Sequence, residues 1–110
     1  MKKIYISGKI TGEQYIPCYH KFLDLENKIE ELQFKAINPM KMCKPTWSWL
    51  RCIIVDLYFI IFHADTIILL PDWESSKGAK LEKRIAKRLK KTITDYDTFI
   101  SEYNNSKINN

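Results

Sequence analysis

Two acidic residues, Asp56 and Glu82, lie in sequence surroundings that do not suit a solvent-exposed charge. Glu82 falls within the lysine-rich segment 77–91, but on a helix every position three or four residues from it holds a small or apolar side chain. Those neighbours are Gly78, Ala79, Ile85 and Ala86. A carboxylate on such a face near the start of a helix is typical of a nucleophile or a base, and a structural role is the alternative.

Asp56 is the only charged residue between Arg51 and Asp65, with His63 counted as neutral. Its helical neighbours would be Cys52, Ile53, Phe59 and Ile60. A carboxylate there must be paired, hydrogen-bonded or protonated, because a bare charge in apolar surroundings costs several kcal/mol. Asp56 is therefore either a second functional acid or the acceptor of a buried hydrogen bond.

The sequence SGKITG at residues 7–12 directly follows an apolar run. Its glycine pattern matches neither the Walker loop nor the dinucleotide-binding fingerprint, so it predicts either a simple turn or a backbone cradle for a phosphate. Trp73 lies in the loop that leads to Glu82 and could form a pocket wall or stack on a base. Neither His20 nor His63 has partners at metal-ligand spacing, so no metal site is expected.

Hydrophobic patterning indicates which elements position these residues. Strands are expected at 3–7, 34–38, 65–70 and 92–94, where short apolar or β-branched runs occur. Helices are expected at 17–32, 47–62 and 77–91, with Thr46 and Ser76 as N-caps of the last two. Residues 40–46 are expected to form a loop, and 95–104 a final helical turn or two.

This order of elements, with unbroken apolar strands, predicts an α/β fold. We expect one doubly wound, Rossmann- or flavodoxin-like domain over residues 1–104, and a flexible polar tail at 105–110. Its parallel sheet would have four to five strands in the order 2-1-3-4, with helices on both faces. The first and third strands then form a switch point, where ligands bind beyond their carboxyl ends. The loop 7–12 and the segment 71–82 must meet there.

The 110 residues suffice for one hydrophobic core, and 45% hydrophobic with 28% charged residues is typical of a globular protein. No leader or membrane anchor is expected, because the apolar stretch 52–62 is too short for a bilayer and contains Asp56. The three cysteines, Cys18, Cys43 and Cys52, are odd in number and lack C-x-x-C spacing. They are expected to be reduced, in a cytoplasmic protein.

The net charge of +5 is concentrated in one segment. Residues 77–91 hold eight lysines and arginines and one acid. Such a segment attracts phosphates or nucleic acid, but it is more often a solvated outer helix face. Nucleic acid is therefore not the expected partner.

Several motifs together resemble the nucleoside 2-deoxyribosyltransferase superfamily, particularly its short bacterial and phage members, and also the 2′-deoxynucleoside 5′-phosphate N-hydrolases. They are IYISGKITG at the start, INP at 37–39, the D-x(8)-D spacing of Asp56 and Asp65, and LLPDWESSKGAKLE at 69–82. The similarity extends over about residues 3–93. It is strongest in the S-x-G-x-x-x-E pattern of Ser76, Gly78 and Glu82.

The resemblance implies a role for individual residues. Glu82 occupies the place of the nucleophile that attacks C1′ and forms a covalent glycosyl-enzyme. Asp56 matches an aspartate that contacts the sugar or assists proton transfer, and Tyr5 an aromatic residue near the sugar. The implied substrate-binding residues are Ser7, Gly8, Lys9, Ile10, Thr11, Gly12, Trp73, Ser76 and Gly78.

The sequence therefore predicts N-glycosidic bond cleavage or transfer on a (deoxy)nucleoside or its 5′-monophosphate, with no cofactor. Trapping an oxocarbenium-like centre by a carboxylate is sound chemistry for that reaction. The alternative is a non-catalytic protein that binds or sequesters a nucleotide or nucleotide-derived signal. The resemblance also implies a homodimer or larger homo-oligomer.

Overall fold

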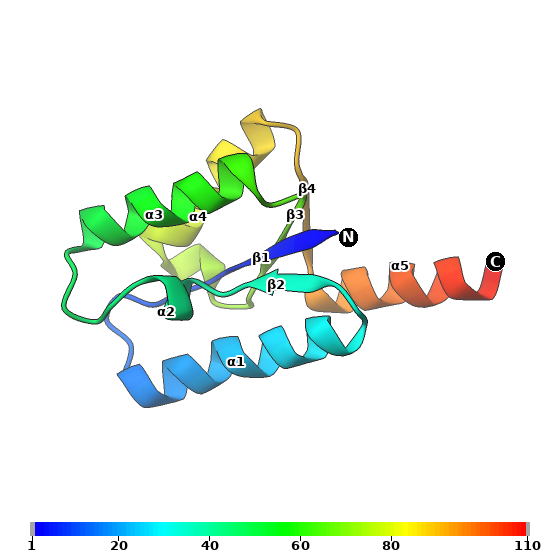
Figure 1. The fold of residues 1–110 in the computed structure, drawn as a ribbon, viewed down its shortest axis with the longest axis horizontal. Helices are drawn as coiled ribbons and strands as arrows, with labels where there is room; N and C mark the ends of the chain where they lie inside the picture. Colours follow the sequence, from blue (N-terminus) through cyan, green and yellow to red (C-terminus); the bar gives the residue numbers. More distant parts are fainter. Residues whose placement is uncertain (1, 110) are drawn as a thin grey trace.

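Four parallel strands form the centre of the protein, in the order β2-β1-β3-β4 (Figure 1). The computed structural model describes residues 2–109. The elements in chain order are β1 (Lys3–Ser7), α1 (Tyr15–Glu31), β2 (Lys35–Ile37), α2 (Pro39–Met42), α3 (Trp49–Phe62), β3 (Thr66–Leu69), the 3-10 turn η1 (Trp73–Ser75), α4 (Lys77–Arg88), β4 (Thr92–Asp95) and α5 (Tyr96–Asn109). The α/β class, the parallel sheet and the strand order predicted from the sequence are confirmed.

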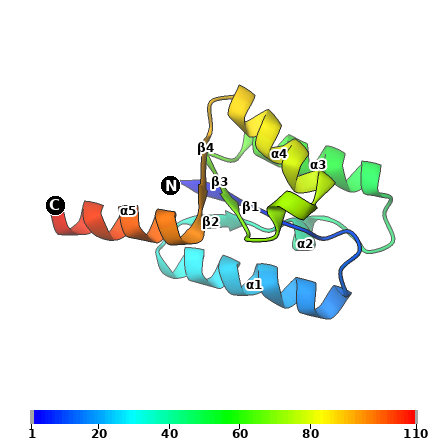
Figure 2. The ribbon, with the colours of Figure 1, turned by 180° about the vertical axis from the view of Figure 1, so that it is seen from behind.

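The two faces of the sheet are covered by different helices (Figures 1 and 2). Alternate residues of a strand point to opposite faces, so β1 contributes to two cores. Ile4 and Ile6 pack with α1 and with Phe99 of α5. Tyr5 lies on the other face, with Ile60 of α3 and Ala86 of α4. The odd-numbered side chains of β1 therefore face α3 and α4.

Several element boundaries differ from those predicted. α1 begins at Tyr15, two residues before the expected start. α2 replaces part of the expected loop, because the Asn38 side chain accepts the Met40 N–H and Pro39 suits the first helical turn. α3 begins at Trp49, because Ser48 and not Thr46 caps it.

The C-terminal third follows the predicted order of elements. Ser76 caps α4 as expected, with its hydroxyl oxygen accepting the Ala79 N–H at 3.1 Å. α5 continues through Asn109, beyond the expected end, and extends away from the body of the molecule (Figure 2). Phe99 anchors its first turns against Phe34, with ring centroids 5.4 Å apart. In the described part of the chain, no helix is both long and apolar enough to span a membrane.

The carboxyl ends of β1 and β3 bring two distant segments into contact. Ser7 pairs with Leu69, and the Leu70 N–H donates to the Ser7 carbonyl at 2.7 Å. A Cβ atom on Gly8 would lie 2.6 Å from Leu70 Cδ1 and 2.9 Å from Leu70 Cβ, which is closer than packed carbon atoms tolerate. Only glycine therefore fits where the chain leaves β1 at the switch point.

Candidate active site

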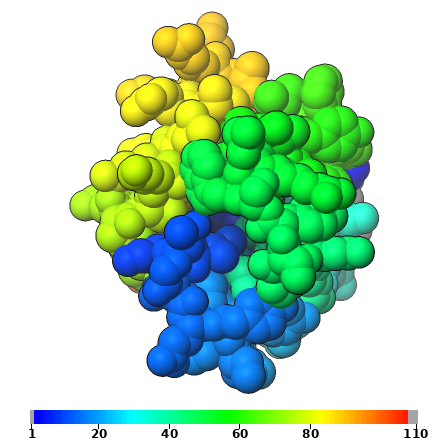
Figure 3. Space-filling model, turned by 90° about the vertical axis from the view of Figure 1, so that its left-hand side faces the viewer, coloured from blue at the N-terminus to red at the C-terminus, as the bar shows by residue number. Residues whose placement is uncertain are grey.

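A cavity of about 340 Å³ opens at this switch point. Figure 3 shows it as a hollow between the segment after β1, in blue, and the segment leading into α3, in green. We call residues 8–14, between β1 and α1, loop 1. Loop 1 forms one side with Gly8, Ile10 and Thr11, and the start of α4 forms another with Ser76 and Gly78.

Glu82 is held at the inner end of the cavity by two hydroxyl groups of β1. Tyr5 donates to Glu82 Oε2 at 2.8 Å, and Ser7 Oγ donates to Oε1 at 2.7 Å. Tyr5 and Ser7 are fully buried, and Glu82 is 4% exposed. The small residues Gly78 and Ala79 leave space on the same face of α4, as the sequence spacing indicated. Both oxygens of Glu82 are therefore fixed in position.

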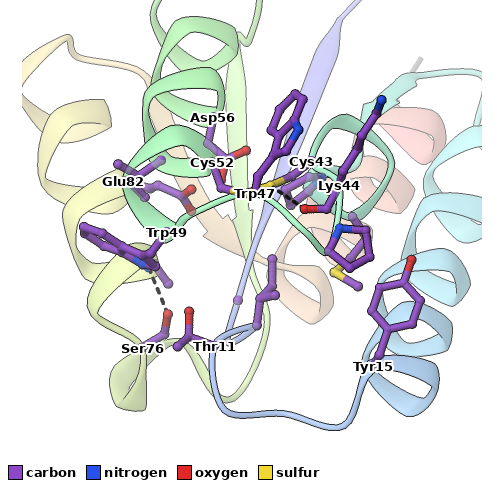
Figure 4. A pocket seen from close by; sticks show the side chains of 18 residues that line it. Thr11, Tyr15, Cys43, Lys44, Trp47, Trp49, Cys52, Asp56, Ser76 and Glu82 are labelled. Carbon is purple, nitrogen blue, oxygen red and sulfur yellow. Dashed lines mark hydrogen bonds between the residues drawn. A yellow bond between two sulfur atoms is a disulfide. The ribbon is translucent and has the colours of Figure 1, made fainter.

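Asp56 reaches the same wall from α3 and is 6% exposed (Figure 4). No hydroxyl or N–H donor of residues 2–109 satisfies its buried Oδ1. The carboxyl groups of Asp56 and Glu82 lie close enough for each to influence the pKa of the other. We call these two residues the carboxyl pair.

Burial dominates the electrostatics of the carboxyl pair, because it penalises the charged forms. It raises the pKa of Glu82 to about 8; the Asp56 charge adds to this rise, and hydrogen bonds from Ser7 and Tyr5 oppose it. Burial likewise raises the pKa of Asp56 to about 6, against hydrogen bonds with Glu82 and Tyr5. These values belong to the pair as a unit, so between pH 6 and pH 8 the pair is expected to hold one proton.

The hydroxyl of Tyr5 stays protonated beside this pair. Its burial, followed by the charges of Glu82 and Asp56, raises the pKa of Tyr5 well above its ordinary value. Tyr5 is therefore a permanent hydrogen-bond donor to Glu82. A pocket with one carboxylate and one carboxylic acid can supply a nucleophile and a general acid together.

Aromatic and apolar side chains surround the outer part of the cavity. We call Tyr15, Trp47 and Trp49 the aromatic rim (Figure 4). None of these three residues was among those predicted from the sequence to bind substrate. The two tryptophans around the start of α3 were a feature of the sequence that could have indicated an aromatic wall. Only the fold shows that Tyr15 of α1 lies at the same cavity.

Four residues predicted to bind substrate lie outside the lining of this cavity: Ser7, Lys9, Gly12 and Trp73. Gly12 adopts a φ of 85° within loop 1, a conformation that favours glycine. Trp73 packs beside the core under α4, with Lys83 Nζ 4.1 Å from its ring centroid. Tyr5 and Ser7 lie behind Glu82 and contact it directly.

Cys43 and Cys52 are joined by a disulfide at the edge of the cavity, with Cα atoms 5.6 Å apart. The prediction that all three cysteines are reduced is wrong for this pair. The segment before α3 folds back on the helix and brings the two Cα atoms within the disulfide range. Cys18 is a free, buried thiol. Among residues 2–109, no three His, Cys, Asp or Glu side chains converge as a set of metal ligands.

The fold and the site together define a class: a doubly wound α/β protein with a buried carboxyl pair at the switch point of its sheet. Over residues 2–95 the chain matches the family model described as domain of unknown function DUF4406, and it belongs to that family. No curated protein matches the chain.

Proposed function

We propose that this protein cleaves or transfers the N-glycosidic bond of a (deoxy)nucleoside or its 5′-monophosphate. The observation that carries the proposal is the carboxyl pair, which retains a proton and faces a cavity with an aromatic rim. The cavity volume of about 340 Å³ falls within the usual range for small-molecule sites. Aromatic rings at its mouth suit stacking on a nucleobase.

The proposed reaction proceeds in two displacements. Because Glu82 has the higher pKa, the proton of the pair must first move from Glu82 to Asp56. The Glu82 carboxylate then forms a bond to C1′ as the C1′–N bond breaks, and the Asp56 carboxylic acid gives that proton to the leaving base. Asp56, now a carboxylate, then takes a proton from water or from an incoming base. That nucleophile attacks C1′ and releases the Glu82 carboxylate, as in retaining glycosidases.

The hydrogen bonds of Tyr5 and Ser7 favour the charged form of Glu82 and so support its role as the nucleophile. The start of α4 is suited to bind the phosphate or sugar oxygens of the substrate. Helix N-termini bind phosphate or sugar oxygens through their N–H groups, and Ser76 and Gly78 line the cavity there. The oxygen of Ser76 accepts the Ala79 N–H, which leaves its own O–H as a donor.

Incubation with a panel of deoxynucleosides and their 5′-monophosphates, followed by chromatography for free base, tests the proposal. With base release established, kcat/KM should depend on pH as a bell with its maximum near pH 7. It should rise with an apparent pKa of about 6, as the pair gains its first carboxylate. It should fall with an apparent pKa of about 8, as the last acidic proton leaves.

Absence of base release from every substrate would contradict the proposal. Ligand-dependent thermal shifts without turnover would then favour a nucleotide-binding protein. A rate that rises monotonically with pH would show that no acid in the pair is needed. From the proposed substrates, we also propose that the protein acts in the cytoplasm.

We further propose that the protein is a homodimer formed through the outer face of α3. Leu50, Ile54, Tyr58 and Phe62 recur every four residues and are 50% to 70% exposed. They form one apolar stripe along the helix, and such contiguous patches mark interaction surfaces. An antiparallel second copy of α3 would be complementary to this uncharged stripe.

The substitution Ile54→Glu places a charge in the middle of the stripe and should convert the dimer to a monomer. Light scattering after size-exclusion chromatography would show a mass that falls by half. Ile16→Glu is the matched control, because Ile16 is 68% exposed on α1, on the other face of the sheet. A wild-type monomer, or a dimer that survives Ile54→Glu, would place the contact elsewhere or exclude it.

A further inference from the structure

Both backbone polar groups of Lys9 in loop 1 are held by side chains from other elements. The Lys9 N–H donates to Asp72 Oδ1 at 3.0 Å, and Lys21 Nζ donates to the Lys9 carbonyl at 3.0 Å. Lys21 and Asp72 also form an ion pair of 2.6 Å. We call Lys21 and Asp72 the Lys9 clamp. It links loop 1 to α1 and to the segment after β3.

The charges of the Lys9 clamp are partly shielded from water. The side chains of Lys21 and Asp72 are 27% and 29% exposed. Burial raises the pKa of Asp72, but hydrogen bonds from Lys21 and the Lys9 N–H outweigh it and lower that pKa below its ordinary value. Glu13 Oε1 lies 3.7 Å from Lys21 Nζ and adds a second acid to the cluster. Asp72 is thus held as a carboxylate that accepts from two donors.

The clamp determines which parts of loop 1 face the cavity. Gly8, Ile10 and Thr11 line it, whereas Lys9 between them does not. The absence of a Cβ on Gly8 lets the loop lie against Leu70, and Asp72 follows two residues later on that segment. The backbone is therefore fixed at adjacent points, by close packing at Gly8 and by hydrogen bonds at Lys9.

We infer that Lys21 and Asp72 are positioning residues, which hold loop 1 so that Gly8 and Ile10, on either side of Lys9, form one wall of the substrate site. They act through the backbone of Lys9, and the charge of the Lys9 side chain is not required. The kinetic consequence of this inference rests on the proposed function. The effect of the clamp on loop 1 itself does not.

Hydrogen exchange of individual backbone amides tests the clamp without a substrate. In Asp72→Ala the Lys9 amide should exchange about tenfold faster or more, because its acceptor is gone. Exchange of the Ile4–Ile6 amides in β1 and the melting temperature should change little. Asp72→Asn keeps an acceptor oxygen and should retain part of the protection. Asp24→Ala, at an exposed acid on α1, is the control.

Steady-state base release tests the consequence for substrate binding. Lys21→Met should raise KM about tenfold while kcat stays within about threefold, because Glu82 is held independently by Tyr5 and Ser7. Lys9→Met removes the side-chain charge of the clamped residue but keeps its backbone N–H and carbonyl, so it should leave both parameters within about twofold. Lys21→Arg should restore most of the affinity, since a guanidinium can donate to both acceptors.

The outcomes separate the inference from the proposed function. Unchanged exchange of the Lys9 amide in Asp72→Ala would overturn the clamp. Faster exchange in Asp72→Ala together with an unaltered KM in Lys21→Met would overturn the role of the clamp in positioning. A larger increase of KM in Lys9→Met than in Lys21→Met would overturn it as well. If the wild-type protein released no base, the proposed function would fail, and the exchange comparison would still decide the clamp.

Discussion

Glu82→Gln should reduce base release by about 10⁴-fold or more, because removal of a nucleophile typically has an effect of that size. Glutamine keeps the length of the side chain and an acceptor for Tyr5 or Ser7, but its amide cannot form a glycosyl ester. The reduction should appear in kcat as well as in kcat/KM, since the bond to C1′ forms only during the reaction. Chromatographic measurement of free base under saturating substrate would detect it.

Glu74→Gln is the matched control for this experiment. Glu74 lies in the exposed turn η1, close to α4 in the chain, and does not line the cavity. The same change of charge there should leave the rate within about twofold. Base release by Glu82→Gln at the wild-type rate would remove Glu82 from the mechanism, whatever the other residues do.

The same Glu82→Gln substitution should stabilise the protein at alkaline pH. In the unfolded chain Glu82 ionises near its ordinary pKa of 4.5, whereas in the folded protein it keeps its proton to about pH 8. Folding therefore binds a proton over this window, and the contribution of Glu82 to stability is lost as the pH rises from 4.5 to 8. Glutamine has no proton to lose, so the variant does not incur that loss.

We expect a gain of about 2 kcal/mol in the free energy of unfolding at pH 9, which corresponds to roughly 8 °C in Tm. The full shift would give more, but lost hydrogen bonds and the coupling to Asp56 reduce it. At pH 4.5 the gain should disappear. Thermal melts of both proteins at the two pH values measure the difference. If the gain in stability of the variant over the wild-type protein were no larger at pH 9 than at pH 4.5, Glu82 would ionise in the folded protein without cost.

Loss of activity with a gain in stability would distinguish a functional carboxylate from a structural one. If the role of Glu82 were structural, its two hydrogen bonds would stabilise the fold, and its replacement would lower the free energy of unfolding at every pH. Asp56→Asn provides a second comparison. Because the pKa of Asp56 is raised less, to about 6, the stabilisation of Asp56→Asn should be smaller than that of Glu82→Gln.

The sheet was predictable because its strands are short, continuous apolar runs separated by helical patterns. β1 matches the expected bounds, and β3 lies within the expected run of residues 65–70. The helix starts were less predictable, since Thr46 and Ser48 are equally good caps in the sequence. Only the structure shows that Ser48 accepts the Arg51 N–H, at 3.2 Å. α2 is too short for any hydrophobic period to indicate it.

The carboxyl pair could be located from the sequence because the helical neighbours of each acid are small or apolar. The donors that hold Glu82 were less evident, since Ser7 was expected to contact substrate and instead donates to Glu82. The Lys9 clamp and the disulfide could not be predicted. Lys21 and Asp72 lie far apart in the chain, and the distance between Cys43 and Cys52 depends on how the intervening segment folds.

The proton retained by the carboxyl pair also affects how the protein exchanges protons with its surroundings. The formal charge of +5 counts Asp56 and Glu82 as ionised, so at neutral pH the folded molecule is one unit more positive than its composition indicates. That proton is stored inside the cavity before a ligand enters. A ligand that seals the cavity from water therefore leaves an acid inside with it. Proton transfer to the leaving group would then be independent of the concentration of buffer in solution.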